Sequence, residues 1–444
     1  MMQVSNMKLY KNIEKMIFIQ VAILMTVSLN VQALTIEHAI ESAVRVDPSL
    51  RSSKLNQLAT EENIAIARAR LLPQITLQGS SNQLTQTTTQ DLPNGISTSR
   101  SFTGPSVNHQ FIVRQALLRP KEISSLRYAE IQNQYMELKY KYDVSELKLK
   151  VINVWIELLV AQQIVKTYAQ SLPYWKAAAR QEFLKYEQGD GTKDAAIEAD
   201  AQYENAKANY LQAEETFKAK QVTFEKLTKI SYNDIVGKKI VMEPWDIVAG
   251  VEKQLIWHKL RESSFEIQLS DMQVIMQLER VKLAESDHKP TFDLLVALNL
   301  AQNDATSTQG YQYKNKQIGI QYSIPLYTGG GVSASVKNAE YTLNATKSEN
   351  EATLMRVEIE FENNWSQFVG AKRRLKALIV SKNAIDEQIK AVNKGYELGT
   401  KTIAEVAATV MLQARREIEV FTTWQDFTKI LIKLKISNTE IFKE

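Results

Sequence analysis

Residues 317–324 read QIGIQYSI, and every second side chain in this stretch is large and apolar. Residues 291–301, TFDLLVALNLA, show the same pattern, with Phe292, Leu294, Val296, Leu298 and Leu300 at every second position. Successive side chains of a strand point to opposite faces, so each stretch predicts a strand with one apolar face. A polar loop rich in Thr, Ser, Gln and Asn lies between them.

A weaker pair of the same kind lies earlier in the chain. Its apolar positions are Ile75, Leu77, Val107, Phe111 and Val113, and the Asn94-Gly95 turn lies between its strands. We predict strands over about 73–90, 100–116, 290–303 and 315–326. Strands of this length with an apolar outer face and a polar inner face are typical of outer-membrane proteins. The pattern alone also allows two hairpins packed on helices.

Most of the remaining chain predicts long helices. Stretches without internal Gly or Pro run over 120–173, 192–236, 251–289, 332–369 and 400–444. One of them carries apolar residues at alternating steps of four and three, which predicts a left-handed coiled coil. The positions of this repeat are Ala199, Tyr203, Ala206, Tyr210, Ala213, Phe217, Lys220, Phe224 and Leu227.

The chain also repeats itself at an offset of 210 residues. Trp155, Tyr186, Gly189 and Thr192 match Trp365, Tyr396, Gly399 and Thr402. The order helix, strand, loop, strand, long helix, turn, helix occurs twice. We therefore expect two structural repeats, over 34–240 and 241–444, because a unit of this length is too long for a solenoid repeat.

Residues 1–33 predict a cleaved secretory signal peptide. Lys8, Lys11 and Lys15 precede an apolar run from Met16 to Leu29, and Val31-Gln32-Ala33 ends on a small residue. This order of a basic region, a short apolar region and a small-residue site is the secretory pattern. The run is shorter than the roughly 20 residues of a spanning helix.

The composition excludes several kinds of chemistry. The charges nearly balance, with Lys+Arg 54 against Asp+Glu 50, which disfavours nucleic acid as a partner. There is no Cys, and the four His residues have no metal-ligand spacing. Gly329-Gly330-Gly331 lacks the Lys-Ser or Lys-Thr of a phosphate loop, so we interpret it as a strand-to-helix turn. We expect no enzyme, no metal and no cofactor.

Three motifs carry a resemblance to a known family. They are Leu71-Leu72-Pro73, the stretch GIQYSIPLYTGGGVSASVKNA over 319–339, and YELGTKTI over 396–403. In this order, in a duplicated chain, they resemble the TolC-like outer-membrane efflux proteins over essentially all of residues 34–440. The resemblance implies a mainly α fold with a small β part. It implies a homotrimer in which each protomer adds four strands to one shared 12-stranded β-barrel and adds long helices to an α-helical barrel that crosses the periplasm.

The resemblance also implies a function. The chain would be the passive outer-membrane exit duct of a Gram-negative bacterium, used in type I protein secretion or multidrug efflux. Its partners would be outer-membrane lipid, a periplasmic adaptor protein and an inner-membrane ABC or proton-driven transporter. Without Cys it cannot carry the N-terminal lipid of many efflux relatives, which favours a duct for protein secretion or general efflux. The alternatives are a periplasmic coiled-coil adaptor and a scaffold without a pore.

The resemblance assigns roles to particular residues. The turns at Gly189-Asp190 and Gly399-Thr400 would dock the adaptor. Tyr396 and Lys401 would hold the entrance shut, with Asp194 or Glu198 as acidic partner, because the position of the family's Asp is Ala195 here. Glu405 would form a cation-selective ring at the pore constriction, without a second ring because Ala408 replaces the other acidic residue. The loops over 85–100 and 302–315 join paired strands and are polar without apolar periodicity, so we expect them to be extracellular.

Overall fold

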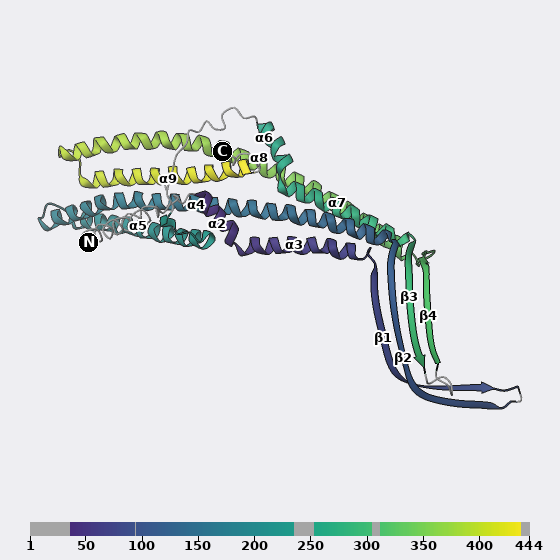
Figure 1. The fold of residues 1–444 in the computed structure, drawn as a ribbon. Coiled ribbons are helices and arrows are strands. Elements are labelled where there is room, and N and C mark those ends of the chain that lie inside the picture. The colour runs from purple at the N-terminus through teal and green to yellow at the C-terminus, as the bar shows by residue number, and fades with distance from the viewer. Residues whose placement is uncertain (1–35, 94, 235–252, 304–310, 437–444) are drawn as a thin grey trace, which may run out of the picture. The chain divides into compact units, whose positions relative to one another are not determined.

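The computed structural model describes residues 36–93, 95–234, 253–303 and 311–436. The predicted signal peptide, Asn94 and the middle of the second strand loop lie outside the described residues. Figure 1 shows helices and four strands in an order that occurs twice along the chain. No helix among the described residues combines the length and the apolarity needed to cross a bilayer.

The first half of the chain begins with two short helices, α2 (Ile36–Val46) and α3 (Pro48–Ala69). Strands β1 (Gln74–Asp91) and β2 (Ser97–Leu118) follow. Two long helices come next, α4 (Pro120–Glu187) and α5 (Lys193–Thr228), and a short 3-10 turn, η1 (Tyr232–Asp234), ends the described part of this half.

The second half repeats this order. Helices α6 (Lys253–Ser263) and α7 (Phe265–Glu285) and the 3-10 turn η3 (Ser286–His288) precede β3 (Thr291–Asn303) and β4 (Tyr311–Ser323). The long helices α8 (Gly331–Glu397) and α9 (Ile403–Ile436) follow. The mainly α fold with four strands per chain is therefore confirmed.

The compact units of the structure do not coincide with the two repeats. One unit contains α2, the part of α4 after Val151, α5, the end of α8 and the start of α9. The other contains α3, all four strands, the first part of α4, α6, α7, most of α8 and the end of α9. Each unit thus draws segments from both halves of the chain.

The four strands form one antiparallel sheet in the order β1-β2-β3-β4. The central pair, β2 and β3, joins the first half of the chain to the second, with Phe111 opposite Leu298 and Val113 opposite Val296. The two outer strands, β1 and β4, therefore come from different halves. Each of them has one edge without a strand partner among the described residues.

The predicted coiled-coil repeat of α5 supplies core residues. Ala206, Ala213 and Phe224 are buried, and Phe217 packs against the same cluster as Phe224. The ring of Phe224 lies 5.5 Å from that of Trp155 in α4, measured between centroids. The repeat therefore packs as the spacing predicts, with small and aromatic residues alternating along one helix face.

The second Trp of the repeated pair also packs among aromatic rings. In α8 the ring of Trp365 lies 6.3 Å from Phe361 and 5.7 Å from Phe368, and Phe368 stacks on Phe427 of α9. Trp155 thus packs between α4 and α5, whereas these ring contacts of Trp365 lie within α8 and connect to α9 through Phe368.

The long helices run past the residues at which we expected them to end. Helix α4 continues through Pro173, and α8 continues through Gly370 and Gly395. A proline removes one backbone donor and frees one carbonyl a turn earlier. Pro173 is exposed, so water can satisfy that carbonyl, while Trp175 and Ala178 on the same turn are buried and hold the helix in place. Conversely, Ser264 divides the stretch 251–289 into two helices.

The first hairpin extends further than its apolar pattern indicates. Most of the predicted loop over 85–100 is strand, because β1 runs to Asp91 and β2 begins at Ser97. Hydroxyl pairs bridge this part, with Oγ1 of Thr85 2.8 Å from Oγ1 of Thr103 and Oγ1 of Thr87 3.1 Å from Oγ of Ser101. Threonine favours strands without apolar alternation. Pairing between β2 and β3 ends at Ser106, and the two-stranded part beyond it bends away in Figure 1.

Candidate functional site

One face of the sheet carries aligned rows of apolar side chains. The register places Ile75, Val113, Val296 and Ile318 in one row, with one residue from each strand. Ile75 and Ile318 expose 67% and 75% of their surface. An apolar face of this extent is not buried against any described part of the chain, which is the pattern of a surface that faces another apolar medium.

The opposite face of the same sheet is mainly polar, although Ile112 and Leu295 also lie on it. Gln78, Gln110, Asn299 and Asn315 form a row of four carboxamides across the strands. Because alternate residues of a strand point to opposite faces, this row and the apolar rows lie on different sides. The sheet thus separates an apolar side from a water-compatible side, as a wall between lipid and an aqueous bore does.

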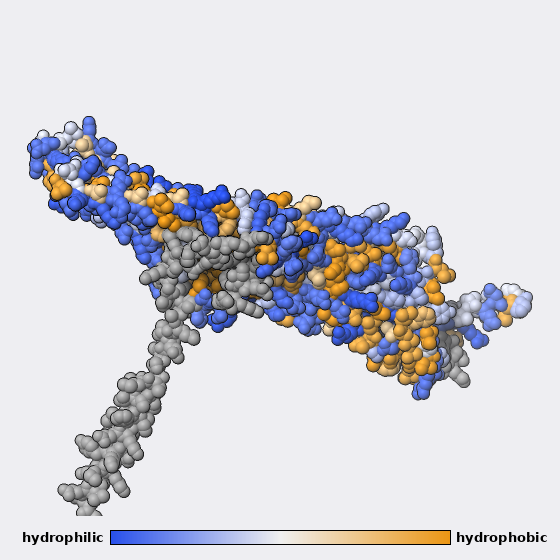
Figure 2. Space-filling view, turned by 90° about the horizontal axis from the view of Figure 1, so that it is seen from above, coloured by the Kyte–Doolittle hydropathy of each residue, from blue (hydrophilic) through white to orange (hydrophobic). Residues whose placement is uncertain are grey.

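The height of the apolar face matches a bilayer. On β3 it extends from Phe292 to Leu300, which is about 27 Å along the strand at about 3.4 Å per residue. Outer-membrane barrels carry an apolar band of about 25 Å bordered by aromatic residues. Here Phe292 and Tyr322 face each other near the helices, with ring centroids 6.2 Å apart. Figure 2 shows a hydrophobic patch where Figure 1 places the sheet.

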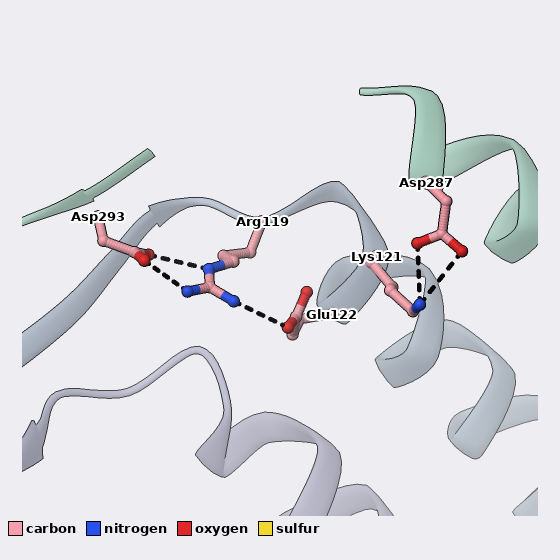
Figure 3. A network of polar contacts seen from close by, with 5 residues as sticks. All are labelled: Arg119, Lys121, Glu122, Asp287 and Asp293. Carbon is pink, nitrogen blue, oxygen red and sulfur yellow. Dashed lines mark hydrogen bonds and ion pairs between the residues drawn. The ribbon is translucent and has the colours of Figure 1, made fainter. Parts of the chain in front are cut away.

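A polar network fixes the junction between strands and helices, and Figure 3 shows it. Arg119, between β2 and α4, donates from Nε to Oδ1 of Asp293 at 2.9 Å, and its other nitrogens reach Asp293 and Glu122. Next to it, Nζ of Lys121 lies 2.8 Å from Oδ1 of Asp287. Asp293 is buried on β3, so its pairing with Arg119 avoids an uncompensated charge there.

In the second half, glycines form the turn between the strand and the helix. Gly329 and Gly330 have φ of 64° and 83°, in the left-handed region that favours glycine, and α8 begins at Gly331. The loop therefore turns directly into the helix. This geometry agrees with a strand-to-helix turn at these residues.

The two predicted docking turns share one backbone geometry. In the first, the amide of Gly189 donates to the carbonyl of Tyr186 at 3.1 Å, and that of Asp190 donates to Lys185 at 2.9 Å. In the second, the amide of Gly399 donates to Tyr396 at 3.0 Å, and that of Thr400 to Gly395 at 2.8 Å. Both pairs of bonds form a Schellman motif, which requires a residue with positive φ. Gly189 has φ of 78° and Gly399 of 71°.

Each turn has a second glycine where two residues six positions apart come close together. In the first turn it is the later residue of the pair, Gly191, and in the second turn it is the earlier one, Gly395. In the first turn, a Cβ atom added at Gly191 would lie 3.0 Å from Cβ of Lys185 and 3.1 Å from the backbone nitrogen of Tyr186. In the second, a Cβ added at Gly395 would lie 2.7 Å from Cγ of Lys401. At the offset of 210, Lys185 corresponds to Gly395 and Gly191 to Lys401. One member of the pair is therefore glycine in each turn.

The structure brings the two turn regions together through their helices. Trp175, Ala178 and Ala206 from the first half pack with Ile403 and Val406 from the second in one buried cluster. The side chains of Asp190, Asp194, Glu198 and Thr400 are exposed near these turns, and Tyr396 is 42% exposed. The residues predicted for adaptor docking and gating therefore lie at equivalent turns of one compact unit.

Lys401 and Glu405, to which we assigned separate roles, contact each other directly. Nζ of Lys401 lies 2.6 Å from Oε1 of Glu405, which places its partner in its own helix turn rather than at Asp194 or Glu198. Oε2 of Glu405 accepts from the amide of Thr402 at 2.8 Å, and Oγ1 of Thr402 accepts from the amide of Glu405 at 3.2 Å. This is a capping box. Hydrogen bonding by Lys401 first, and then by Thr402, lowers the pKa of Glu405 below its ordinary value of 4.5.

Sequence reasoning missed three features of these sites. The Thr402-x-x-Glu405 spacing signals a capping box and could have been found. The second glycines of the two turns, Gly191 and Gly395, which we call the reciprocal glycines, have no local signal, because Gly395 looks like an isolated helix glycine. The Arg119–Asp293 pair joins residues 174 positions apart, which no periodicity links. Within the described residues, no group of three or more His, Asp or Glu side chains could hold a metal ion.

Comparison with known proteins places this chain among outer-membrane proteins. The model of the outer membrane efflux protein family matches residues 39–228 and 256–426. The proteases secretion protein PrtF of Dickeya chrysanthemi is 24% identical over 426 residues, which cover 91% of this chain and 89% of PrtF. The outer membrane protein TolC of Vibrio cholerae is 24% identical over 399 residues, which cover 87% of this chain and 86% of that TolC.

The fold agrees with solved channels. The CmeC outer membrane channel of Campylobacter jejuni superposes with a TM-score of 0.74 at 14% identity, over 92% of this chain and 86% of CmeC. The open state of the MtrE outer membrane channel of Neisseria gonorrhoeae gives 0.70 at 16% identity, over 91% of this chain and 88% of MtrE. The family model covers both halves of the chain, and the fold matches over almost the whole length. The chain therefore belongs to the outer membrane efflux protein family.

Proposed function

We propose that this chain is the outer-membrane exit duct of a tripartite export system. It is a passive trimeric channel, opened by a periplasmic adaptor and an inner-membrane transporter of the ABC or proton-driven kind. The observation that carries the proposal is the sheet face with its aligned, exposed apolar rows and a polar row on the other side. An adaptor or a poreless scaffold in the periplasm would have no use for such a face, because water would surround it.

Closure of the sheet supports the trimer. Four strands do not close a barrel, and open strand edges in hydrocarbon leave backbone groups unpaired at several kcal/mol each. Pairing of β4 in one protomer with β1 in the next satisfies both edges. Three copies of four strands supply twelve, which is wide enough for an aqueous bore, whereas the interior of eight strands is nearly filled by side chains.

The test compares adjacent residues on opposite faces of β4. Ile318→Arg places a charge on the lipid face and should cost about 2–4 kcal/mol near mid-bilayer, whereas Gln317→Arg lies on the bore side and should be tolerated. Heat-modifiable trimers in the outer-membrane fraction, conducting in planar bilayers, should therefore form with Gln317→Arg and not with Ile318→Arg. Recovery of the wild-type chain as a strictly soluble periplasmic protein would contradict the proposal.

Adaptor docking belongs at the turns of Gly189-Asp190 and Gly399-Thr400. Their Schellman geometry leaves both Gly Cα atoms open, since nothing lies within 4 Å of a Cβ atom added at either. A partner backbone can therefore approach closely. Gly189→Val with Gly399→Val should abolish export while trimers remain in the membrane. The double Asn variant is the control, because Asn tolerates positive φ. Full export by the Val pair would refute docking at these turns.

The entrance gate involves Tyr396 and Lys401, with Asp194 or Glu198 as acidic groups on the first half. In a closed state Lys401 can pair either with Glu405 in its own turn or with a carboxylate of the first half. The ion pair between Lys401 and the first half is therefore easily broken. Exposed pairs of this kind contribute little individually, which suits a gate that adaptor binding opens. Tyr396→Phe with Lys401→Ala should raise single-channel conductance. Unchanged conductance would place the constriction elsewhere.

Glu405 is the residue proposed for a cation-selective constriction. Its contact with Lys401 at 2.6 Å gives this proposal a directional test, because each Lys401 offsets one Glu405 charge. Lys401→Gln should increase cation selectivity and block by trivalent cations, while Glu405→Gln should decrease both. Trimer assembly should be intact in both variants. Equal selectivity in the two variants would mean that Glu405 does not line the constriction.

Protein secretion is the proposed use of the duct. Two relatives are named for it, PrtF and the alkaline protease secretion protein AprF of Pseudomonas aeruginosa, which is 20% identical over 374 residues. Cross-linking followed by co-purification of the adaptor and transporter distinguishes the systems. Recovery of an ABC transporter supports type I secretion, and recovery of a proton-driven pump supports multidrug efflux.

A further inference from the structure

The apolar face of the sheet ends in basic residues on the side away from the helices. On β4, Tyr322, Ile320 and Ile318 follow one another on this face from the helix end, and Lys316 and Lys314 continue the same alternation. The register places Lys316 opposite Leu298 and Lys314 opposite Leu300. Both Lys side chains are exposed. The pattern therefore changes from aliphatic to cationic within one strand, at the edge of the apolar rows.

A histidine lies in the same row. Gly79, His109, Leu300 and Lys314 are aligned across the four strands. A Cβ atom added at Gly79 would lie 3.1 Å from Nδ1 of His109, so the imidazole extends over the glycine of β1. At about 4.8 Å between strands, His109 and Lys314 are about 10 Å apart, and Lys314 and Lys316 are about 7 Å apart along β4.

On this face, no carboxylate of the described residues of β1–β4 lies near these groups. Among the described residues of β1–β4, the acidic side chain that shares the face is Asp91, at the far end of β1, where Oδ1 accepts a hydrogen bond from Ser97. It is twelve residues from Gly79, which is about 40 Å along the strand. Arg114 and Asp293 alternate onto the other face. Among the described strand residues, the edge of the apolar rows is therefore cationic without a compensating carboxylate.

A lysine is costly at mid-bilayer and nearly neutral in cost at the interface. Its ammonium group can also extend from an apolar surface to the head-group level. The position of Lys314 and Lys316 thus suits the boundary between acyl chains and head groups. If the helices are periplasmic, this boundary belongs to the leaflet that faces outward.

We propose that Lys314, Lys316 and His109 bind the phosphate groups of anionic lipids in the outer leaflet. The inference rests on the proposed function, because it requires the apolar face to lie in the outer membrane. The two ammonium groups and the imidazole N–H supply donors at spacings that two phosphates of one head group can bridge. The aliphatic rows beside them receive the acyl chains of the same lipid, so the site selects phosphorylated lipid over free phosphate.

The test uses trimers of the whole chain in phosphatidylcholine vesicles, with and without diphosphorylated lipid A. The binding of lipid A to the trimers, measured as the lipid A that stays bound to them through washing, should be about 30-fold weaker in the double variant Lys314→Gln/Lys316→Gln. This is the loss expected for two basic side chains near an anionic lipid surface. His109→Gln should reduce the binding of lipid A several-fold. The control Lys337→Gln/Lys347→Gln removes two exposed lysines of α8 and should bind like wild type.

Three results would overturn the inference, provided that the wild type forms conducting trimers. They are equal lipid A retention in the two double variants, loss of retention on adding millimolar inorganic phosphate, and equal retention of dephosphorylated lipid A. Failure of the wild type to form conducting trimers would contradict the proposed function instead. Single-channel conductance of each variant verifies that it has folded and assembled.

Discussion

The two helix turns, one in each half of the chain, have the same backbone and different side-chain chemistry. Both close with the same pair of hydrogen bonds and a glycine at positive φ. In the first turn, the position equivalent to Glu405 is Ala195, and that equivalent to Lys401 is Gly191. Only the second turn therefore has the capping box and the ion pair between Lys401 and Glu405.

This difference separates what the fold requires from what the two halves were free to change. The Schellman geometry is common to both, so the helix reversal depends on it. The reciprocal glycines show that both turns also share the close contact between two residues six positions apart. The glycine that leaves room for it is the later residue in the first turn and the earlier residue in the second. The ion pair and the capping box are not common, so the electrostatics at the tip differ between the two halves.

The largest expected effect comes from the shared feature. Gly189→Val and Gly399→Val each force a β-branched residue to positive φ, which costs about 2 kcal/mol. Amide exchange at Asp190 and at Thr400 should therefore accelerate roughly 30-fold, to the same extent in both turns. The corresponding Asn variants serve as controls. A clear inequality between the two turns would show that their backbones are not equivalent in energy.

The second prediction tests the reciprocal glycines. Gly395→Ala brings a Cβ to 2.7 Å from Cγ of Lys401, and such overpacking costs about 1–3 kcal/mol, offset in part by the better helix propensity of Ala. Adding Lys401→Gly should restore much of the loss in amide protection at Thr400.

Rescue should be weaker in the first turn. A Cβ at Gly191 also approaches the backbone of Tyr186, so Lys185→Gly cannot relieve the whole contact in Gly191→Ala. Equal rescue in both turns would show that the backbone contact does not matter.

The third prediction concerns the capping box. Thr402→Ala and Thr192→Ala each remove an N-cap hydroxyl, which costs about 1 kcal/mol. The Thr402 variant should lose more protection at the start of its helix, because Oγ1 of Thr402 also donates to Oε2 of Glu405 and so holds that carboxylate in its capping position, whereas Thr192 has no acidic partner at Ala195. Ser variants at both positions should behave like wild type. Identical losses would mean that the reciprocal bond of Glu405 adds nothing.

The smallest effect is a pH dependence confined to the second turn. The pKa of Glu405 is lowered in the folded chain, so its contribution is present above the ordinary value of 4.5 and is lost as the pH falls through the lower folded value. Amide protection at Thr400 should decrease relative to that at Asp190 between pH 6 and pH 3, after correction for intrinsic exchange. Glu405→Gln should abolish the difference. A difference that persists in this variant would have another origin.

Local patterns predicted most of the fold. The alternation at Phe292–Leu300 and Ile318–Ile324 located the second hairpin, because a strand with one apolar face carries apolar residues at every second position. The heptad spacing of α5 predicted its packing, since small and aromatic residues alternate where helices meet. The family resemblance and the fold class were confirmed for the same reason: they rest on features that recur along the whole chain.

Features that depend on distant or non-apolar contacts were not predictable. The outer part of the first hairpin is held by hydroxyl pairs such as Thr85–Thr103, which give no apolar alternation. Helix α4 passes Pro173 because neighbouring residues are buried, which local propensity does not reveal. At the candidate sites, the positions of Gly189 and Gly399 followed from the repeat, but the contact between Lys401 and Glu405 required the geometry of the helix start.

The seam between β2 and β3 has a consequence for the origin of the chain. Since it joins the two halves within one polypeptide, a half-length chain with a single hairpin would need six copies to build the twelve strands of the proposed trimer. Every seam between hairpins would then form between separate molecules. Fusion of two halves places every second junction between hairpins within one polypeptide. Assembly then needs half as many contacts between separate molecules. It also frees the two halves to diverge, which a ring of identical hairpins could not do.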